Sequence, residues 1–169
     1  MLTFKELTRV PDTAAGGGVS KKLPDFMQHQ LQSNWCWAAN GASVGNLYHG
    51  PDSYSQCGIS DDCLNKKSCC DDPVNDDCNV YGYLDKALKA AKSFDRMQSG
   101  TTSYDNVQAE INEGKPIGTR VAWNGAGAHF MMITGYDTDR NKIFVQDPWH
   151  GTTTIAYTQY PSHYHGGGT

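Results

Sequence analysis

The sequence predicts an α+β fold, in which an N-terminal helical part packs against a C-terminal antiparallel β-sheet. The helical patterns precede residue 114, and four short β-rich runs follow it. Helices followed by strands are typical of α+β domains rather than of alternating α/β folds. The 169 residues suit one domain, and no apolar run reaches the roughly 18 residues of a membrane span.

The first predicted helix runs from Trp35 to about Tyr48 and forms the centre of the helical part. Its small residues let neighbouring backbone approach closely, while its two glycines each cost about 1 kcal/mol relative to alanine. Tertiary packing must therefore stabilise this helix, as expected for a central, buried one. Ser33 or Asn34 is expected to cap its first turn.

Two further helices are predicted before the sheet. The run 81–91 places small and apolar residues on one helical face, and a second, short helix is expected at 104–113. Ser103 is suited to cap this second helix, and Gly114 is suited to end it.

Four runs in the last third of the chain have strand length, β-branched residues and polar or glycine breaks. Residues 136–142 between the second and third runs are expected to form a hairpin connection, which favours antiparallel pairing. The predicted strands cover residues 117–123, 129–136, 142–146 and 152–157.

Residues 57–78 form a cysteine- and aspartate-rich insert that is expected to be mostly loop with short helical turns. It holds five of the six cysteines, and its six aspartates and two lysines account for the whole net charge of −4. Two disulfides with one thiol left over, reduced thiols and a metal site are three readings, the last weakened because the insert has no histidine. We assign the insert no catalytic part, and its acidity raises the hypothesis that it influences substrate choice.

The two ends of the chain are expected to lie outside the domain. Residues 1–24 are interpreted as a flexible arm and 161–169 as a flexible tail, because both contain runs of three glycines, which leaves 25–160 for the domain. Gly16–Gly18 is better explained as a linker than as a site of self-cleavage. The N-terminus lacks the layout of a signal peptide, so the sequence does not decide the compartment.

Cys36 is the candidate nucleophile. It is the one cysteine outside the insert and stands at the predicted start of a helix. A helix N-terminus and a nearby imidazolium both favour the reactive thiolate, and Trp35 and Trp37 are bulky enough to limit water around the sulfur. A small buried core cysteine is the alternative reading.

Gln30 is the candidate oxyanion-hole residue. It precedes Cys36 by six residues, and its side-chain amide together with the Cys36 backbone N–H would supply two donors to a tetrahedral intermediate. Gln32 is the second choice for this role, and a solvated surface glutamine is the alternative.

His129 and Asp147 are the candidate base and orienting acid. His129 opens a predicted strand after a glycine- and alanine-rich run that leaves backbone accessible to a substrate chain. Asp147 ends the next strand, where its carboxylate would orient the imidazole, and Trp149 would cover the pair. A hydrogen-bonded structural histidine and a turn-forming aspartate are the alternatives.

These residues occur in an order that resembles the papain-like cysteine peptidase superfamily. In that family Gln, Cys, His and Asn or Asp follow one another, with a Trp just beyond the last. Here the pattern covers about residues 26–157, with Asp in the last place and 93 residues between Cys36 and His129, against roughly 130 in plant and lysosomal members. The short spacing and the run Trp35–Ala39 resemble the compact bacterial branch, namely effector proteases of plant pathogens and, more distantly, double-glycine leader peptidases.

The resemblance implies a papain-like fold and a cysteine endopeptidase that needs no cofactor or metal and acts through a thioester. It implies a protein or peptide substrate and a protein that is secreted or delivered into a target cell. The acidic balance argues against a nucleic-acid or anionic membrane partner, and we favour a monomer. A deamidase or amine transferase with the same triad, and a non-catalytic binding module stapled by disulfides, stay open.

Overall fold

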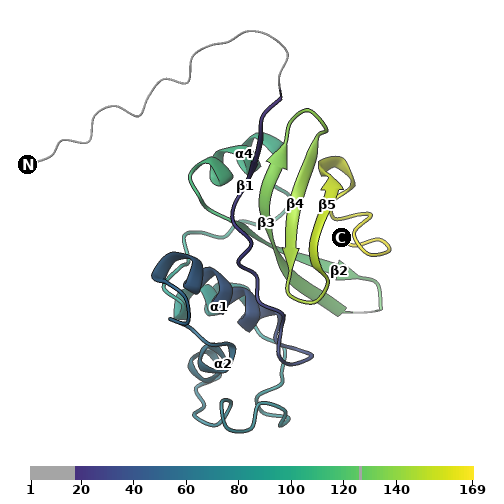
Figure 1. The fold of residues 1–169 in the computed structure, drawn as a ribbon. Coiled ribbons are helices and arrows are strands. Elements are labelled where there is room, and N and C mark those ends of the chain that lie inside the picture. The colour runs from purple at the N-terminus through teal and green to yellow at the C-terminus, as the bar shows by residue number, and fades with distance from the viewer. Residues whose placement is uncertain (1–17, 126) are drawn as a thin grey trace, which may run out of the picture.

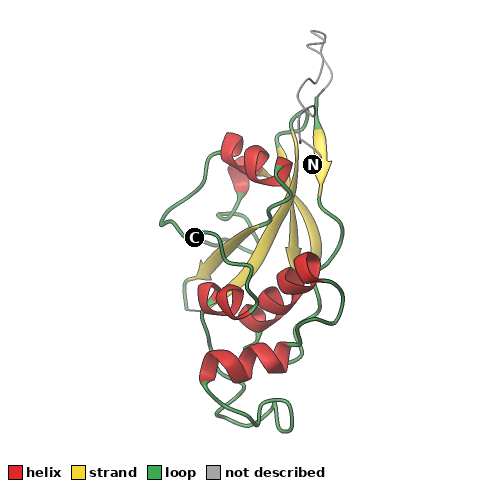
Figure 2. Cartoon of the chain, turned by 90° about the vertical axis from the view of Figure 1, so that its left-hand side faces the viewer, coloured by secondary structure: helices red, strands yellow, loops and turns green. Residues whose placement is uncertain are grey.

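The computed structural model describes residues 18–125 and 127–169, and its arrangement confirms the predicted α+β class (Figure 1). Helices α1, α2 and α3 gather at one end, while α4 lies against the antiparallel sheet (Figures 1 and 2). The elements in chain order are β1 Ser20–Lys22, α1 Cys36–His49, α2 Gln56–Leu64, α3 Leu84–Ala90, α4 Tyr104–Asn112, β2 Ile117–Trp123, β3 Gly127–Asp137, β4 Lys142–Asp147, β5 Gly151–Ala156 and the 3-10 turn η1 Tyr157–Gln159.

Helix α1 is the buried centre of the helical part, as its small residues predict. Its first ten residues are all buried, and it packs against α2, α3 and β3. A Cβ atom on Gly41 would lie 2.8 Å from the Ala87 Cβ of α3, and one on Gly45 would lie 2.6 Å from the Tyr54 ring. The close approach of these elements therefore requires glycine at both positions.

The predicted cap of α1 is wrong. The helix begins at Cys36, its N-cap is Trp35, and no side chain caps it. Ser33 and Asn34 hydrogen-bond instead to Asn79, the residue after the insert: Asn79 Nδ2 donates to Ser33 Oγ (2.9 Å), and Asn34 Nδ2 donates to the Asn79 carbonyl (2.8 Å). By contrast, Ser103 caps α4 as predicted, since its Oγ accepts the Asn106 N–H.

The sheet is built around β3, whose eleven residues pair antiparallel with three other strands. β4 lies along one side of β3, while β2 and β1 share the other side, β2 along Gly127–Ile133 and β1 along Gly135–Asp137. β5 completes the sheet beyond β4. The four predicted strands are confirmed to within about two residues at each end.

The chain has two hydrophobic cores that meet at β3. Val121, Met131 and Val145 of the sheet pack with Val107 and Ile111 of α4 in one core, whereas tryptophans, alanines and cysteines of the helical part form the other. Phe130 of β3 packs against the helical core. A buried amide also joins the two parts, because Asn40 Nδ2 of α1 donates to the Cys36 carbonyl (2.7 Å) and to the Phe130 carbonyl (2.9 Å).

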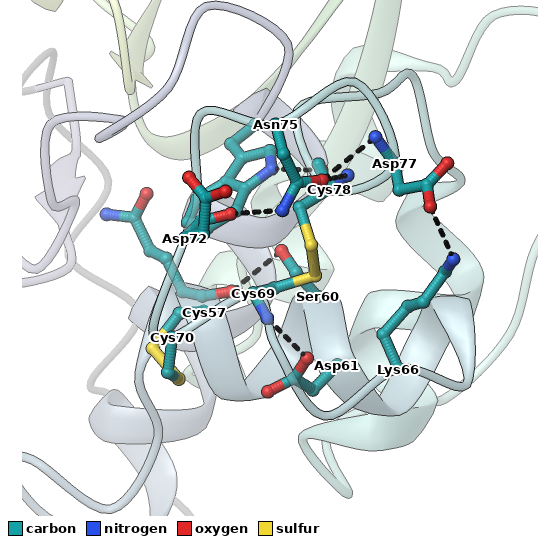
Figure 3. Close-up of a disulfide and its surroundings, with 12 residues drawn as sticks. Cys57, Ser60, Asp61, Lys66, Cys69, Cys70, Asp72, Asn75, Asp77 and Cys78 are labelled. Carbon is teal, nitrogen blue, oxygen red and sulfur yellow. Dashed lines mark hydrogen bonds and ion pairs between the residues drawn. A yellow bond between two sulfur atoms is a disulfide. The ribbon is translucent and has the colours of Figure 1, made fainter.

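The insert contains two disulfides and one free thiol, which agrees with the first of the three readings. The bridges join Cys57 to Cys70 and Cys69 to Cys78 (Figure 3). Cys63 is free and half-buried. The insert is more helical than expected, because α2 covers residues 56–64. Two aspartates of the insert make contacts within it: Asp61 accepts the Cys69 N–H (2.9 Å), and Asp77 pairs with Lys66 (3.0 Å) (Figure 3).

Both ends of the domain extend further than the sequence predicts. Residues 1–17, most of the expected arm, lie outside the described residues, but Ser20–Lys22 pair with β3 and Leu23 is buried. The expected tail 161–169 instead packs on β2. The backbones of Ala122 and Thr169 exchange two hydrogen bonds (2.8 and 2.9 Å), and Tyr164 is buried. The sequence does not predict these two attachments, because a three-residue strand and a single buried tyrosine produce no periodic pattern.

None of the helices in the described ranges is long and apolar enough to cross a membrane.

Candidate active site

Cys36 is the first residue of α1 and points toward β3. It is a free cysteine, only 7% exposed, and its side chain lies close enough to the His129 imidazole to raise the pKa of that ring. The helix start carries no side-chain cap, and the Cys36 backbone N–H has no acceptor among residues 18–125 and 127–169. A thiol at an uncapped helix N-terminus therefore lies beside both a positive helix dipole and an unused backbone donor.

The turn before the cysteine, residues 30–35, is fastened to the end of the insert. Trp35 Nε1 donates to the Cys78 carbonyl (2.7 Å), and the Asn34 N–H donates to Asn79 Oδ1 (3.0 Å). Trp37 Nε1 donates to the Val80 carbonyl (3.0 Å). Cys78 is also bridged to Cys69 (Figure 3). The residue that accepts the Trp35 hydrogen bond, and so holds the turn before the thiol, is therefore itself fixed by a disulfide.

His129 and Asp147 come from neighbouring strands and form a short hydrogen bond. His129 Nε2 lies 2.7 Å from Asp147 Oδ1, and the Asp147 side chain is fully buried while that of His129 is 15% exposed. With Nε2 on the carboxylate, the other ring nitrogen, Nδ1, is left for the thiol. The structure thus brings Cys36, His129 and Asp147 together, with the imidazole bonded to the carboxylate and beside the thiol.

The Asp147 carboxylate receives four hydrogen bonds. Besides His129, Oδ1 accepts the backbone N–H groups of Trp149 (2.7 Å) and His150 (3.0 Å), and Oδ2 accepts the Tyr164 hydroxyl (2.7 Å). Burial on its own would raise the pKa of Asp147, but the bond to and attraction of His129 and the bonds from Tyr164 and the His150 N–H lower it to about 2. The carboxylate is therefore ionised at neutral pH.

The imidazole is held in its charged form. Burial on its own would lower the pKa of His129, but hydrogen bonds to Asp147 and Cys36 and attraction by both groups raise this pKa to about 9. At neutral pH the site thus carries a buried aspartate next to an imidazolium, and the imidazolium faces the sulfur.

Gln30 lies in the same turn, but its amide donors are occupied. The residue is buried, and its Nε2 donates to the carbonyls of Gln32 (2.8 Å) and Ser33 (2.9 Å). Its backbone N–H donates to the Pro148 carbonyl (2.9 Å), which ties the turn to the residues after Asp147. Its Oε1 is buried without a partner among the described residues. Gln32, the second choice, is half-buried.

Tyr164 takes the covering position that the sequence assigns to Trp149. Trp149 is 49% exposed and its ring stacks on His29 at 5.5 Å, whereas Tyr164 is buried and bonds to the carboxylate. Burial and the Asp147 charge both raise the pKa of Tyr164, so its hydroxyl stays a donor. Sequence reasoning missed this residue because it lies among polar and glycine residues with no pattern.

A cavity of about 1190 Å³ lies between α3, α4 and β2, with Leu84, Arg96, Glu110, Arg120 and Met132 in its lining. Cys36, His129 and Asp147 do not line it. The group of Cys36, His129 and Asp147, rather than this cavity, is the candidate active site.

The model of one protein family, described as papain-like cysteine protease AvrRpt2, matches residues 19–165. The match spans most of the chain, from β1 to the residue after Tyr164, and includes the insert, the thiol and the histidine–aspartate pair. A search of curated proteins finds no match to the chain.

Proposed function

Because the chain belongs to the papain-like cysteine protease AvrRpt2 family, we propose that it hydrolyses peptide bonds with Cys36 as nucleophile, His129 as base and acid, and Asp147 as the orienting group. The observation that carries this assignment is the 2.7 Å hydrogen bond between His129 and a fully buried carboxylate, with the Cys36 thiol beside the same imidazole. A nucleophile–base–orienter triad needs these three groups next to one another in this order.

The proposed reaction begins from the thiolate–imidazolium pair. The Cys36 sulfur attacks the peptide carbonyl, and the His129 imidazolium then protonates the leaving amine as the thioester forms. The neutral imidazole next removes a proton from water, which attacks the thioester and releases the acid product. Asp147 holds the ring and stabilises its charged form throughout, and the chain's own side chains suffice for each proton transfer.

The oxyanion hole is proposed to consist of the Cys36 N–H and the Gln30 side-chain amide. The unused Cys36 N–H supports the first donor. For the second, one Gln30 N–H must leave the Gln32 or Ser33 carbonyl when the charged oxygen forms. This exchange is favourable because a hydrogen bond to an anionic oxygen is stronger than one to a neutral carbonyl.

Protein substrates are proposed, on the ground of the family. Secretion or delivery into a target cell is proposed as well, supported by the two disulfides, which persist in oxidising surroundings. We propose a monomer. A deamidase or amine transferase would use the same acyl-enzyme, but the family match favours hydrolysis. The free Cys36 thiol beside the His129 imidazole argues against a binding module that merely buries the cysteine.

Labelling with an epoxide inhibitor of papain-type enzymes tests the assignment of the nucleophile. Mass spectrometry is expected to find the label on Cys36 and not on Cys63, the other free thiol. Cys36→Ala should abolish cleavage of a denatured protein mixture, whereas the matched variant Cys63→Ser should cleave normally. New peptide N-termini distinguish hydrolysis from deamidation, which releases ammonia alone. An unlabelled Cys36 in a folded protein would refute the proposal.

A further inference from the structure

Two histidines besides His129 lie next to the buried carboxylate and take no part in the proposed reaction, and the ring of one of them, His150, lies edge to face with that of His129 at 6.2 Å. His150 follows Asp147 in the turn between β4 and β5, and His165 comes from the C-terminal segment that packs on β2. Their rings stack with centroids 4.0 Å apart. One ligand atom from each of Asp147, His150 and His165 lies within 4.8 Å of the other two.

These three side chains have free coordination capacity. Within the described ranges, neither the His150 ring nor the His165 ring hydrogen-bonds to protein, and both imidazoles are exposed. On Asp147, Oδ1 already accepts three hydrogen bonds, but Oδ2 accepts only the Tyr164 hydroxyl. Since a carboxylate oxygen has about two acceptor directions, one direction at Oδ2 stays open.

The ligand set selects the class of metal. Two imidazole nitrogens and one carboxylate oxygen suit Zn²⁺, whereas Mg²⁺ and Ca²⁺ prefer oxygen ligands alone. With metal–ligand distances of about 2.0–2.2 Å, ligand atoms of a tetrahedral site lie roughly 3.3–3.6 Å apart. The present separations are within 4.8 Å, and the two exposed imidazoles can close the difference by side-chain rotation.

We propose that Asp147, His150 and His165 bind a Zn²⁺ ion, with water in the fourth position, and that the bound ion suppresses proteolysis. The second half rests on the proposed role of Asp147. A cation on this carboxylate competes with the His129 imidazole for the same group and so disturbs the orientation of the ring toward the sulfur. The first half stands on the geometry of the three ligands alone.

Calorimetric titration with ZnCl₂ tests the binding. The titrated protein is the full chain with Cys36→Ser and Cys63→Ser, because both free thiols are zinc ligands in their own right. One ion per chain is expected. His150→Gln and His165→Gln should each weaken binding by about tenfold or more, since even the loss of an outer-shell partner costs 10- to 100-fold.

His163→Gln is the matched control, because His163 is exposed, lies two residues from His165 and bonds to Ser162 instead. It should bind zinc as tightly as the Cys36→Ser/Cys63→Ser protein that keeps all its histidines. Loss of stoichiometric binding on replacing the two thiols, or equal affinity in all three histidine variants, would overturn the site.

Inhibition by zinc is measured for each variant as the ratio of its activity with zinc to its activity without zinc. The protein with Cys36 intact should be inhibited, and His165→Gln should need about tenfold more zinc for equal inhibition. Unchanged zinc sensitivity in His165→Gln, together with weakened calorimetric binding, would refute inhibition through this site. A protein without proteolytic activity would instead contradict the proposed function, and the calorimetric result would still decide the metal site.

Discussion

The helical half and the sheet half of the molecule hold their candidate catalytic residues by different means. Cys36 begins a helix of small residues, and the turn before it is fixed by tryptophan and asparagine hydrogen bonds to a disulfide-bridged segment. His129 and Asp147 lie on adjacent strands over an aliphatic core, and a C-terminal tyrosine supports the carboxylate. Covalent bridges support the loop-rich half, whereas backbone pairing and burial suffice in the other.

Removal of one disulfide should break this contrast most clearly. Cys69→Ser/Cys78→Ser should lower the free energy of unfolding by about 2–5 kcal/mol. It should also lower kcat by up to about 10²-fold, because the bridged residue that holds the turn before Cys36 is no longer fixed. Cys57→Ser/Cys70→Ser is the matched control, since it removes a bridge that does not contain Cys78. Urea unfolding and peptide hydrolysis measure the two effects. Equal kcat losses in both variants would contradict a positioning role for the Cys69–Cys78 bridge.

Replacement of Gln30 sharpens the comparison within the nucleophile's turn. Gln30→Ala should lower kcat by about 10²–10³-fold, because it removes one proposed oxyanion donor. Gln32→Ala should have little effect on kcat, because only the backbone carbonyl of that residue contacts Gln30. Steady-state kinetics on one peptide decide between the two, and a larger loss for Gln32→Ala would reverse the assignment.

Tyr164→Phe tests the support on the sheet side. The Asp147 carboxylate loses one buried hydrogen bond, so the free energy of unfolding should fall by about 1.5–3 kcal/mol at neutral pH. The pKa of Asp147 should rise, because the Tyr164 bond helps to lower it. Tyr160→Phe is the control, since the Tyr160 hydroxyl bonds to Thr119 instead. Urea unfolding between pH 2 and 7 reports both changes, and identical behaviour of the two variants would argue against support through Tyr164.

Stability should depend on pH through His129 in alkaline solution and through Asp147 in acid solution. The pKa of His129 is raised to about 9 from 6.5, so the stability of its charged pair is complete below pH 6.5 and is lost as pH rises through about 9. The pKa of Asp147 is lowered to about 2, so its contribution is complete above pH 3.8 and is lost toward pH 2. The alkaline limb of kcat/KM should therefore fall near pH 9, and a limb near 6.5 would exclude this pairing.

The sequence predicts the helices α1, α3 and α4 and the four longer strands, and two bridges with one thiol left over are one of its three readings of the insert, because periodicity, glycine breaks and parity are local signals. It does not predict α2. It does not predict which cysteines pair, because all four bridged positions lie within one loop-rich segment. It also misses β1, since three exposed residues carry no alternation. The cap of α1 fails because Ser33 and Asn34 find partners 45 or more residues away.

The candidate site divides in the same way. Cys36, His129 and Asp147 each stand at the beginning or end of a predicted element, so their meeting follows from the topology. Tyr164 and the occupied donors of Gln30 depend on how two irregular segments fold back, and no local pattern encodes such packing.

The Asn40 amide has a consequence for how the protein responds to heat. This single side chain bonds to the carbonyls of both Cys36 and Phe130, the residue next to His129. The gap between sulfur and imidazole is therefore set by a group that touches neither reacting atom. The halves cannot part without breaking the buried hydrogen bond from Asn40 to the Phe130 carbonyl, so inactivation on warming should coincide with cooperative melting of the whole chain.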